Sequence, residues 1–152
     1  MRTPSYQRSQ WIWPLWIATP AVMLAAAGGL QVGLSRDDMI ATACVAAISL
    51  AVLLVLGKLT LEIDETRLCW RFGLLGWPRW QVRLADVASV EKTSTRFIDG
   101  WGIRKTREGM LYNASGYGAV RLRLRDGRTL RLGTDEPERL AGFIAARLRR
   151  PG

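Results

Sequence analysis

The segment VRLRLRDGRTLRL, residues 120–132, alternates aliphatic and arginine side chains on both sides of an Asp-Gly pair at 126–127. Because successive side chains of a strand point to opposite faces, this period of two predicts two strands, each with an apolar and a positively charged face. An Asp-Gly pair is typical of a two-residue turn, which would place Arg123 opposite Leu130 and mix the two faces. We therefore expect a three-residue connection or a bulge that slips the pairing by one residue, with Arg123 opposite Arg131.

Other segments of the C-terminal two thirds show the same alternation and predict short strands. They are residues 59–64, 67–72, 79–84, 87–93, 109–115, 119–124 and 129–133. Residues 134–150 predict a helix that covers an open end of the sheet, because Leu140, Phe143, Ile144 and Leu148 recur at helical spacing. Thr134 or Asp135 can cap its start. The fold class expected is α+β, mainly β: a barrel of about seven antiparallel strands with one C-terminal capping helix.

Three stretches resemble a known family when taken in order. GWGIR (100–104), YNASG (112–116) and GTDEPERL (133–140) are together similar to bacterial pleckstrin-homology-like (PH-like) domain proteins of the membrane. The resemblance covers about residues 59–149. It implies a PH-like barrel attached to a membrane, and it brings no catalytic residues.

The N-terminal third differs in composition from the rest of this basic chain, whose net charge is +9. The uncharged runs 11–34 and 39–57 would be roughly 36 and 28 Å long as helices at about 1.5 Å per residue. Both lengths are comparable to a hydrocarbon core of about 30 Å. We therefore expect a two-helix transmembrane hairpin over residues 11–57, preceded by a tail (1–10) and followed by the PH-like domain (58–152).

The flanks of these runs predict an orientation. Lys and Arg lie before the first run and after the second, whereas the connecting loop has Arg36 beside two aspartates. The positive-inside rule then places both termini in the cytoplasm, in a multi-pass protein of the bacterial inner membrane. The first run also fits a secretory signal peptide, with Arg2 and Arg8 before it and AAAGG as a cleavage site, which would leave the second run as a lone anchor.

Few residues of the sequence suit catalysis. Histidine, the commonest general base and metal ligand, is absent, and no cluster of metal-ligating residues occurs. The thiol of Cys69 has no histidine to activate it. The sequence therefore predicts a protein that is not an enzyme and that needs neither a metal nor another cofactor.

Two surfaces are candidates for binding. Arginines that face each other across strands repel unless an anion or an acidic side chain lies between them, and each Lys or Arg near an anionic leaflet contributes about 1 kcal/mol. The first candidate, which we name the arginine comb, is Arg121, Arg123, Arg125, Arg128 and Arg131. The alternative interpretation of the comb is a solvated sheet face.

The second candidate surface is a Gly/Pro-rich turn. Leu74, Leu75 and Trp77 lie there between Arg71 and Arg79, and an apolar tip ringed by arginine suits a membrane interface. The alternative is that Leu75 and Trp77 fold back onto the barrel.

The function expected is a non-enzymatic, membrane-anchored recognition or docking module at the cytoplasmic face. Its ligand would be anionic phospholipid headgroups or a protein segment. The alternatives are a subunit or scaffold of a membrane complex, including a homo-oligomer, and a basic nucleic-acid-binding domain. We expect no nucleic acid as partner, because the tryptophans mostly alternate inward rather than form a stacking platform.

Overall fold

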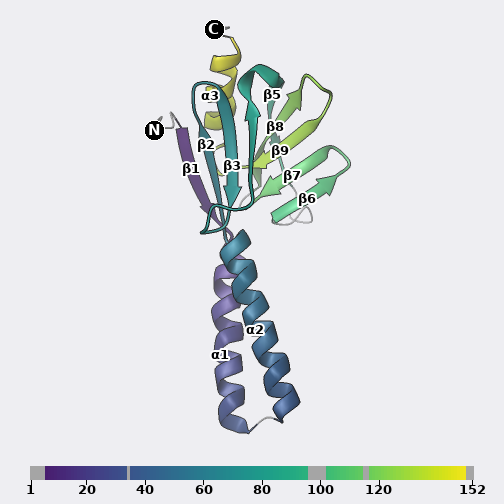
Figure 1. Cartoon of the computed structure of the whole chain (residues 1–152). Helices are drawn as coiled ribbons and strands as arrows, with labels where there is room; N and C mark the ends of the chain where they lie inside the picture. The colour runs from purple at the N-terminus through teal and green to yellow at the C-terminus, as the bar shows by residue number, and fades with distance from the viewer. Residues whose placement is uncertain (1–5, 34, 96–101, 115–116, 150–152) are drawn as a thin grey trace.

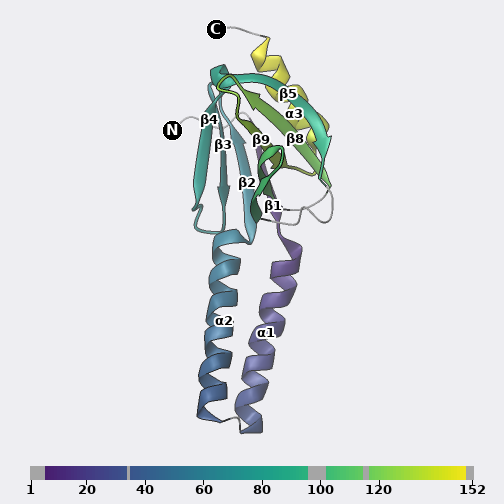
Figure 2. The same cartoon turned by 90° about the vertical axis from the view of Figure 1, so that its right-hand side faces the viewer.

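The computed structural model describes residues 6–33, 35–95, 102–114 and 117–149. They form a β domain that stands on two long helices, α1 (Trp13–Val32) and α2 (Arg36–Leu56). The two helices run antiparallel and pack side by side, as Figures 1 and 2 show. We call this pair of helices the stalk.

One helix among the described residues is long and apolar enough to cross a membrane, and it is α2. The apolar part of α1, Trp13–Gly29, is shorter. The expectation of two transmembrane spans, over 11–34 and 39–57, is therefore wrong. The physical reason lies at the ends of the first run: Trp11 belongs to a strand, and Gly33 adopts a left-handed conformation that ends the helix.

A strand that the sequence analysis did not expect precedes the stalk. Residues assigned above to a tail form β1 (Tyr6–Trp11), which pairs antiparallel with β2 (Lys58–Ile63). The pairing continues to the stalk, because the Ile12 amide donates a hydrogen bond to the Gly57 carbonyl at 3.0 Å. The stalk is thus inserted between two neighbouring strands, and both of its ends are held at the same edge of the domain.

The strands form two sheets rather than one barrel. The first has the order β1-β2-β3-β4, with β3 (Arg67–Phe72) and β4 (Arg79–Arg83). A short 3₁₀ helix, η1 (Leu84–Asp86), then leads into the second sheet, whose order is β5-β8-β9-β7-β6. The strands of the second sheet are β5 (Val87–Ser94), β6 (Gly102–Thr106), β7 (Gly109–Asn113), β8 (Gly118–Leu124) and β9 (Thr129–Gly133).

This arrangement corrects the expected fold class of a single barrel of about seven antiparallel strands. The described residues form sheets of four and five strands, and β7 runs parallel to β9. Two of the strands, β1 and β6, were not expected from the alternation. The chain changes sheet at η1, so β5 pairs with β8 instead of extending the first sheet beyond β4.

The core lies between the two sheets, on the faces that the alternation marks as apolar. Leu61 and Trp70 face inward from the first sheet and Leu122 and Leu132 from the second, and all four are buried. The C-terminal helix α3 (Pro137–Leu148) packs against β5, β8 and η1. It starts later than expected, because its N-cap residue is Glu136 rather than Thr134 or Asp135, and the Glu136 side chain makes no capping hydrogen bond.

The β8–β9 hairpin confirms the three-residue connection and corrects the pairing. The Leu124 amide donates to the Arg128 carbonyl at 2.8 Å across a turn in which Gly127 has a φ of +87°. Arg121, not Arg123, lies opposite Arg131. Both pairings keep apolar residues opposite apolar residues and leave three residues in the turn, which are 126–128 in the expected pairing and 125–127 in the observed one, where Gly127 supplies the positive φ.

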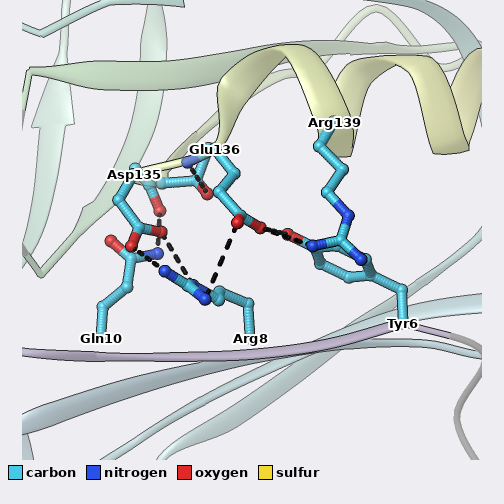
Figure 3. A network of polar contacts seen from close by, with 8 residues as sticks. Tyr6, Arg8, Gln10, Asp135, Glu136 and Arg139 are labelled. Atoms are coloured by element: carbon cyan, nitrogen blue, oxygen red, sulfur yellow. Dashed lines mark hydrogen bonds and ion pairs between the residues drawn. The ribbon is translucent and has the colours of Figure 1, made fainter.

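A polar network fastens β1 to the connection between β9 and α3 (Figure 3). The Arg8 guanidinium donates to both carboxylate oxygens of Asp135, at 3.1 Å from Nε and 2.5 Å from Nη2. Gln10 donates to the Gly133 carbonyl at 3.1 Å, and the Tyr6 hydroxyl lies 3.5 Å from Glu136. We call this network the β1 clasp, because it ties the edge of the first sheet to the second.

The β1 clasp predicts a loss of stability in acid. The hydrogen bond from Arg8 holds the pKa of Asp135 below its usual value. A carboxyl with a lowered folded-state pKa stabilises the fold above its unfolded pKa, about 3.9, and this contribution is lost as the pH falls through the folded pKa. We expect the Tm of Asp135→Asn to be lower than that of the wild type at pH 7 and to fall less between pH 5 and pH 3.

The control for this prediction is Glu65→Gln, which changes an exposed acid away from the β1 clasp. Thermal melts followed by circular dichroism in detergent micelles measure both variants. An equal dependence on pH in Asp135→Asn and wild type would contradict the prediction.

Candidate functional site

The structure divides the arginine comb into an internal part and an exposed part. Arg121 lies opposite Arg131, and Glu108 from the β6–β7 turn lies between them, 2.6 Å from Arg121 and 3.6 Å from Arg131. Glu91 adds a second carboxylate 3.7 Å from Arg121. Arg131 is buried and donates to the Ser94 carbonyl at 2.7 Å. These two arginines are therefore engaged within the second sheet.

The other arginines of the comb are exposed. Arg123 lies on the outer face of β8, whereas Arg125 and Arg128 belong to the β8–β9 connection. In Figures 1 and 2 this connection is at the end of the domain farthest from the stalk. The five residues of the comb therefore do not form one site.

Arg125 and Arg128 instead join arginines of the first sheet around a cleft of about 650 Å³, which we call the distal cleft. The cleft lies between the end of β4, η1 and the β8–β9 connection. Its charged lining residues are Arg67, Arg83, Arg125, Arg128, Asp86 and Asp126. Arg67 and Arg83 belong to the first sheet, so the alternation within residues 120–132 could not connect them with the comb.

The distal cleft keeps an excess of positive charge. Arg67 lies directly opposite Arg83 across β3 and β4. Asp126 accepts hydrogen bonds from the Arg128 amide and guanidinium, at 2.9 and 2.7 Å, and these bonds lower its pKa. Within the described residues, no carboxylate lies within 4.0 Å of the guanidinium of Arg83 or Arg125. Like charges opposed on neighbouring strands destabilise a sheet unless an anion lies between them, so the cleft suits an anionic ligand.

The opposite end of the first sheet meets the stalk through the turn between β3 and β4, residues 73–78. The Leu74 amide donates to the Leu54 carbonyl at 2.9 Å. This hydrogen bond satisfies one of the carbonyls in the last turn of α2, which have no partner within the helix. Gly73 has a φ of +75°, and a Cβ atom there would lie 2.3 Å from the same carbonyl oxygen. Glycine is thus required where the turn rests on the helix end.

The tip of this turn is apolar and exposed. Leu75 and Trp77 are 77% and 69% exposed, so the alternative that they fold back onto the domain is wrong. At its base Arg71 pairs with Glu62 at 2.7 Å, whereas the opposing Arg79 is exposed. We call the tip and its two arginines, Leu74, Leu75, Trp77, Arg71 and Arg79, the proximal surface.

Aromatic side chains surround the same junction between domain and stalk. Trp16 donates from its indole to the Gly57 carbonyl at 2.9 Å and packs edge-on against Trp11 at 4.9 Å between ring centroids. The Lys58 ammonium lies 5.0 Å from the centroid of the Trp11 ring. Trp13 is largely exposed. Tryptophan and basic side chains gathered at the end of an apolar helix are typical of a membrane–water interface.

Few described side chains suit reaction chemistry. The described part of the chain holds no group of three or more His, Cys, Asp or Glu residues arranged for a metal ion. Burial raises the pKa of the Cys69 thiol, which lowers the fraction of reactive thiolate. The two surfaces described above are thus the strongest candidates for a functional site, and the absence of enzymatic activity stays a prediction.

Comparisons of the chain with models of protein families, with curated proteins and with solved structures find no match. The resemblance to PH-like domain proteins stays a prediction based on residues 100–104, 112–116 and 133–140. Parts of the first two stretches, 100–101 and 115–116, lie outside the described residues.

Proposed function

We propose that this protein is a membrane-anchored recognition module, in which α2 is embedded in lipid and the β domain stands at the polar surface. The observation that carries the proposal is the apolar exterior of the stalk. Ile17 and Leu24 on α1 are 70% and 74% exposed, and Ile48 on α2 is also exposed. A continuous apolar exterior of this kind is unfavourable in water and favourable in a bilayer.

The two attachments of the stalk support one location for the domain. Because β1 and β2 pair, both ends of the stalk are attached to the domain at the same edge. The excess of Lys and Arg in these flanks over the loop at Arg36 favours the cytoplasmic side. The proposed location of the domain is therefore the cytoplasmic face of a bacterial inner membrane.

The proximal surface supports direct contact of the domain with lipid headgroups. It lies where α2 ends, so embedding α2 brings Leu75 and Trp77 to the interface. Arg79 has no carboxylate within 4.0 Å among the described residues, so its charge is available to an anionic headgroup at about 1 kcal/mol. The domain would thus be oriented on the bilayer and not merely tethered to it.

Quenching by nitroxide-labelled lipids tests this orientation in the full chain. In a Cys44→Ser, Cys69→Ser background, a fluorescent label at Leu75→Cys should be quenched in vesicles of phosphatidylglycerol and phosphatidylcholine. The same label at Glu65→Cys, which lies at the far end of β2 and β3, should not be quenched. Equal quenching at both positions, or release of the unlabelled chain from membranes by alkaline carbonate without detergent, would refute the proposal.

A pair of arginine variants separates headgroup binding from insertion alone. Arg79→Gln should reduce quenching at position 75 in anionic vesicles, and Arg123→Gln should not, although both arginines are exposed and lack an ion pair within the described residues. The contrast should disappear in purely zwitterionic vesicles. An equal effect of the two variants would mean that the proximal surface has no special role.

A further inference from the structure

We propose that the distal cleft binds an extended acidic segment of a partner protein, which pairs with the open edge of β4 and places its carboxylates on Arg83 and Arg125. The location of this site relative to the membrane rests on the proposed function. The binding chemistry does not, because it depends on the cleft alone.

The position of the cleft argues against lipid of the anchoring membrane as its ligand. Arg67 starts β3, and Phe72 ends it next to the turn that rests on α2. At about 3.3 Å per residue, roughly 17 Å of strand separates the cleft from the level of the proximal surface. Charges this far from a membrane surface are largely screened, because the Debye length is about 8 Å at physiological ionic strength. The ligand must therefore come from the aqueous side.

The cleft lies along a strand edge that can pair with another chain. β4 is the last strand of the first sheet, with a neighbour on one side only among the described strands. Val82 points toward the core side of β4 and Gln81 and Arg83 toward the outer face, yet all three line the cleft. A cavity that touches both faces of an edge strand lies at its edge, where free backbone groups can accept an added strand.

The charges of the cleft favour carboxylates and apolar side chains over a phosphate backbone. Arg83 and Arg125 have no acidic partner within the described residues, whereas Arg128 is paired with Asp126. Asp86 and Asp126 interrupt the positive charge of the cleft, so the cleft suits separate carboxylates on Arg83 and Arg125 rather than the continuous negative charge of a nucleic acid. Val82 and Leu124 provide apolar lining between the charged groups. An extended segment in which acidic and apolar residues alternate matches both features.

The cleft is also held in shape before any ligand arrives. The Arg125 amide donates to the Asp86 carbonyl at 2.9 Å, which fixes the β8–β9 connection against η1. The Leu84 amide donates to the Thr66 carbonyl at 2.8 Å and fixes the end of β4 against the start of β3. A preformed site loses less conformational freedom on binding than a flexible one.

Fluorescence anisotropy with a defined probe tests the proposal. The probe is a fluorescein-labelled eight-residue peptide of alternating Glu and Val, added to the full chain in nanodiscs of zwitterionic lipid. The double variant Arg83→Gln, Arg125→Gln should bind it at least tenfold more weakly than the wild type. The matched control Arg107→Gln, Arg123→Gln removes two exposed arginines that lie outside both the cleft and the proximal surface, and it should bind within twofold of the wild type.

Competitors identify the class of ligand. A peptide with N-methyl groups at alternate residues should bind at least tenfold more weakly, because it cannot complete the strand pairing. Failure of the Glu-Val peptide to bind, equal weakening in both double variants, or stronger competition by inorganic phosphate or a DNA duplex would each overturn the proposal. If the peptide binds the distal cleft but the label at position 75 is not quenched, only the proposed lipid contact is refuted. The two proposals can therefore be refuted independently.

Discussion

Replacing Trp70 with alanine should lower the free energy of unfolding by about 3–5 kcal/mol. The variant should therefore be largely unfolded at temperatures just below the Tm of the wild type. Trp70 is 2% exposed and joins the two sheets. Its ring lies 5.1 Å edge-on from Tyr112 of β7 and 6.4 Å stacked from Trp80 of β4, between ring centroids. Its indole N–H has no hydrogen-bond partner among the described residues, so its contribution to stability comes from packing.

Trp77→Ala is the matched control for this prediction. Trp77 lies in the turn that follows the strand of Trp70, and it is 69% exposed. Its replacement should therefore change the free energy of unfolding by no more than about 0.5 kcal/mol. Urea unfolding in detergent micelles, followed by near-UV circular dichroism, measures both. A similar loss of stability in the two variants would contradict the packing described here. Trp77→Ala should instead weaken the quenching of a label at position 75.

These two tryptophans show what the sequence pattern can decide. Trp70 belongs to an alternating run, so its burial followed from the period of two, and the structure confirms it. Trp77 lies in a turn, where no periodicity assigns a face. Its exposure is set by the contact of Gly73 and Leu74 with the end of α2, which is a tertiary contact.

The strand β1 was missed for a related reason. Its sequence, YQRSQW, places Gln10 at an inward position that an apolar residue normally occupies. The Nε2 of this buried amide donates to the Gly133 carbonyl, 123 residues away along the chain. Where a buried position holds a polar residue whose partner is distant in sequence, the strand lacks the apolar–polar alternation by which strands are predicted. The wrong span boundary at residue 11 is a consequence, because the strand takes the residue assigned to the helix.

The candidate site was predicted in part. The arginines of the comb were identified, but the acids that neutralise two of them, Glu91 and Glu108, come from strands or turns outside that segment. The distal cleft requires β4 and the β8–β9 connection to meet, although they belong to different sheets. Local pattern shows which side chains are charged, whereas the topology decides which of them share a site.

The pairing of β1 with β2 leads to the second prediction with a large effect, which concerns the boundary of the folded unit. Residues 58–152 alone should not form a stable domain. They lack Tyr6 and Ile12, whose burial contributes about 1.5–3 kcal/mol each, and they lack the β1 clasp. They also leave β2 as an unpaired edge. Against a typical total stability of about 5–15 kcal/mol, this loss is large enough to unfold the domain.

The stalk itself should be dispensable for folding if β1 is kept. The Ile12 amide already donates to the Gly57 carbonyl at 3.0 Å, the geometry of the closing pair of a hairpin. Replacing residues 13–56 by Asn-Gly should therefore join β1 and β2 through a two-residue turn and yield a water-soluble, folded β domain. Size-exclusion chromatography should show a monomer for this joined chain, and its thermal melt should be cooperative. Residues 58–152 alone should show neither.

Tyr6→Ser and Ile12→Ser in the joined chain should abolish the cooperative melt, because they remove the apolar contacts of β1 while keeping its length. Equal stability of residues 58–152 and the joined chain would show that β1 is not part of the folded unit.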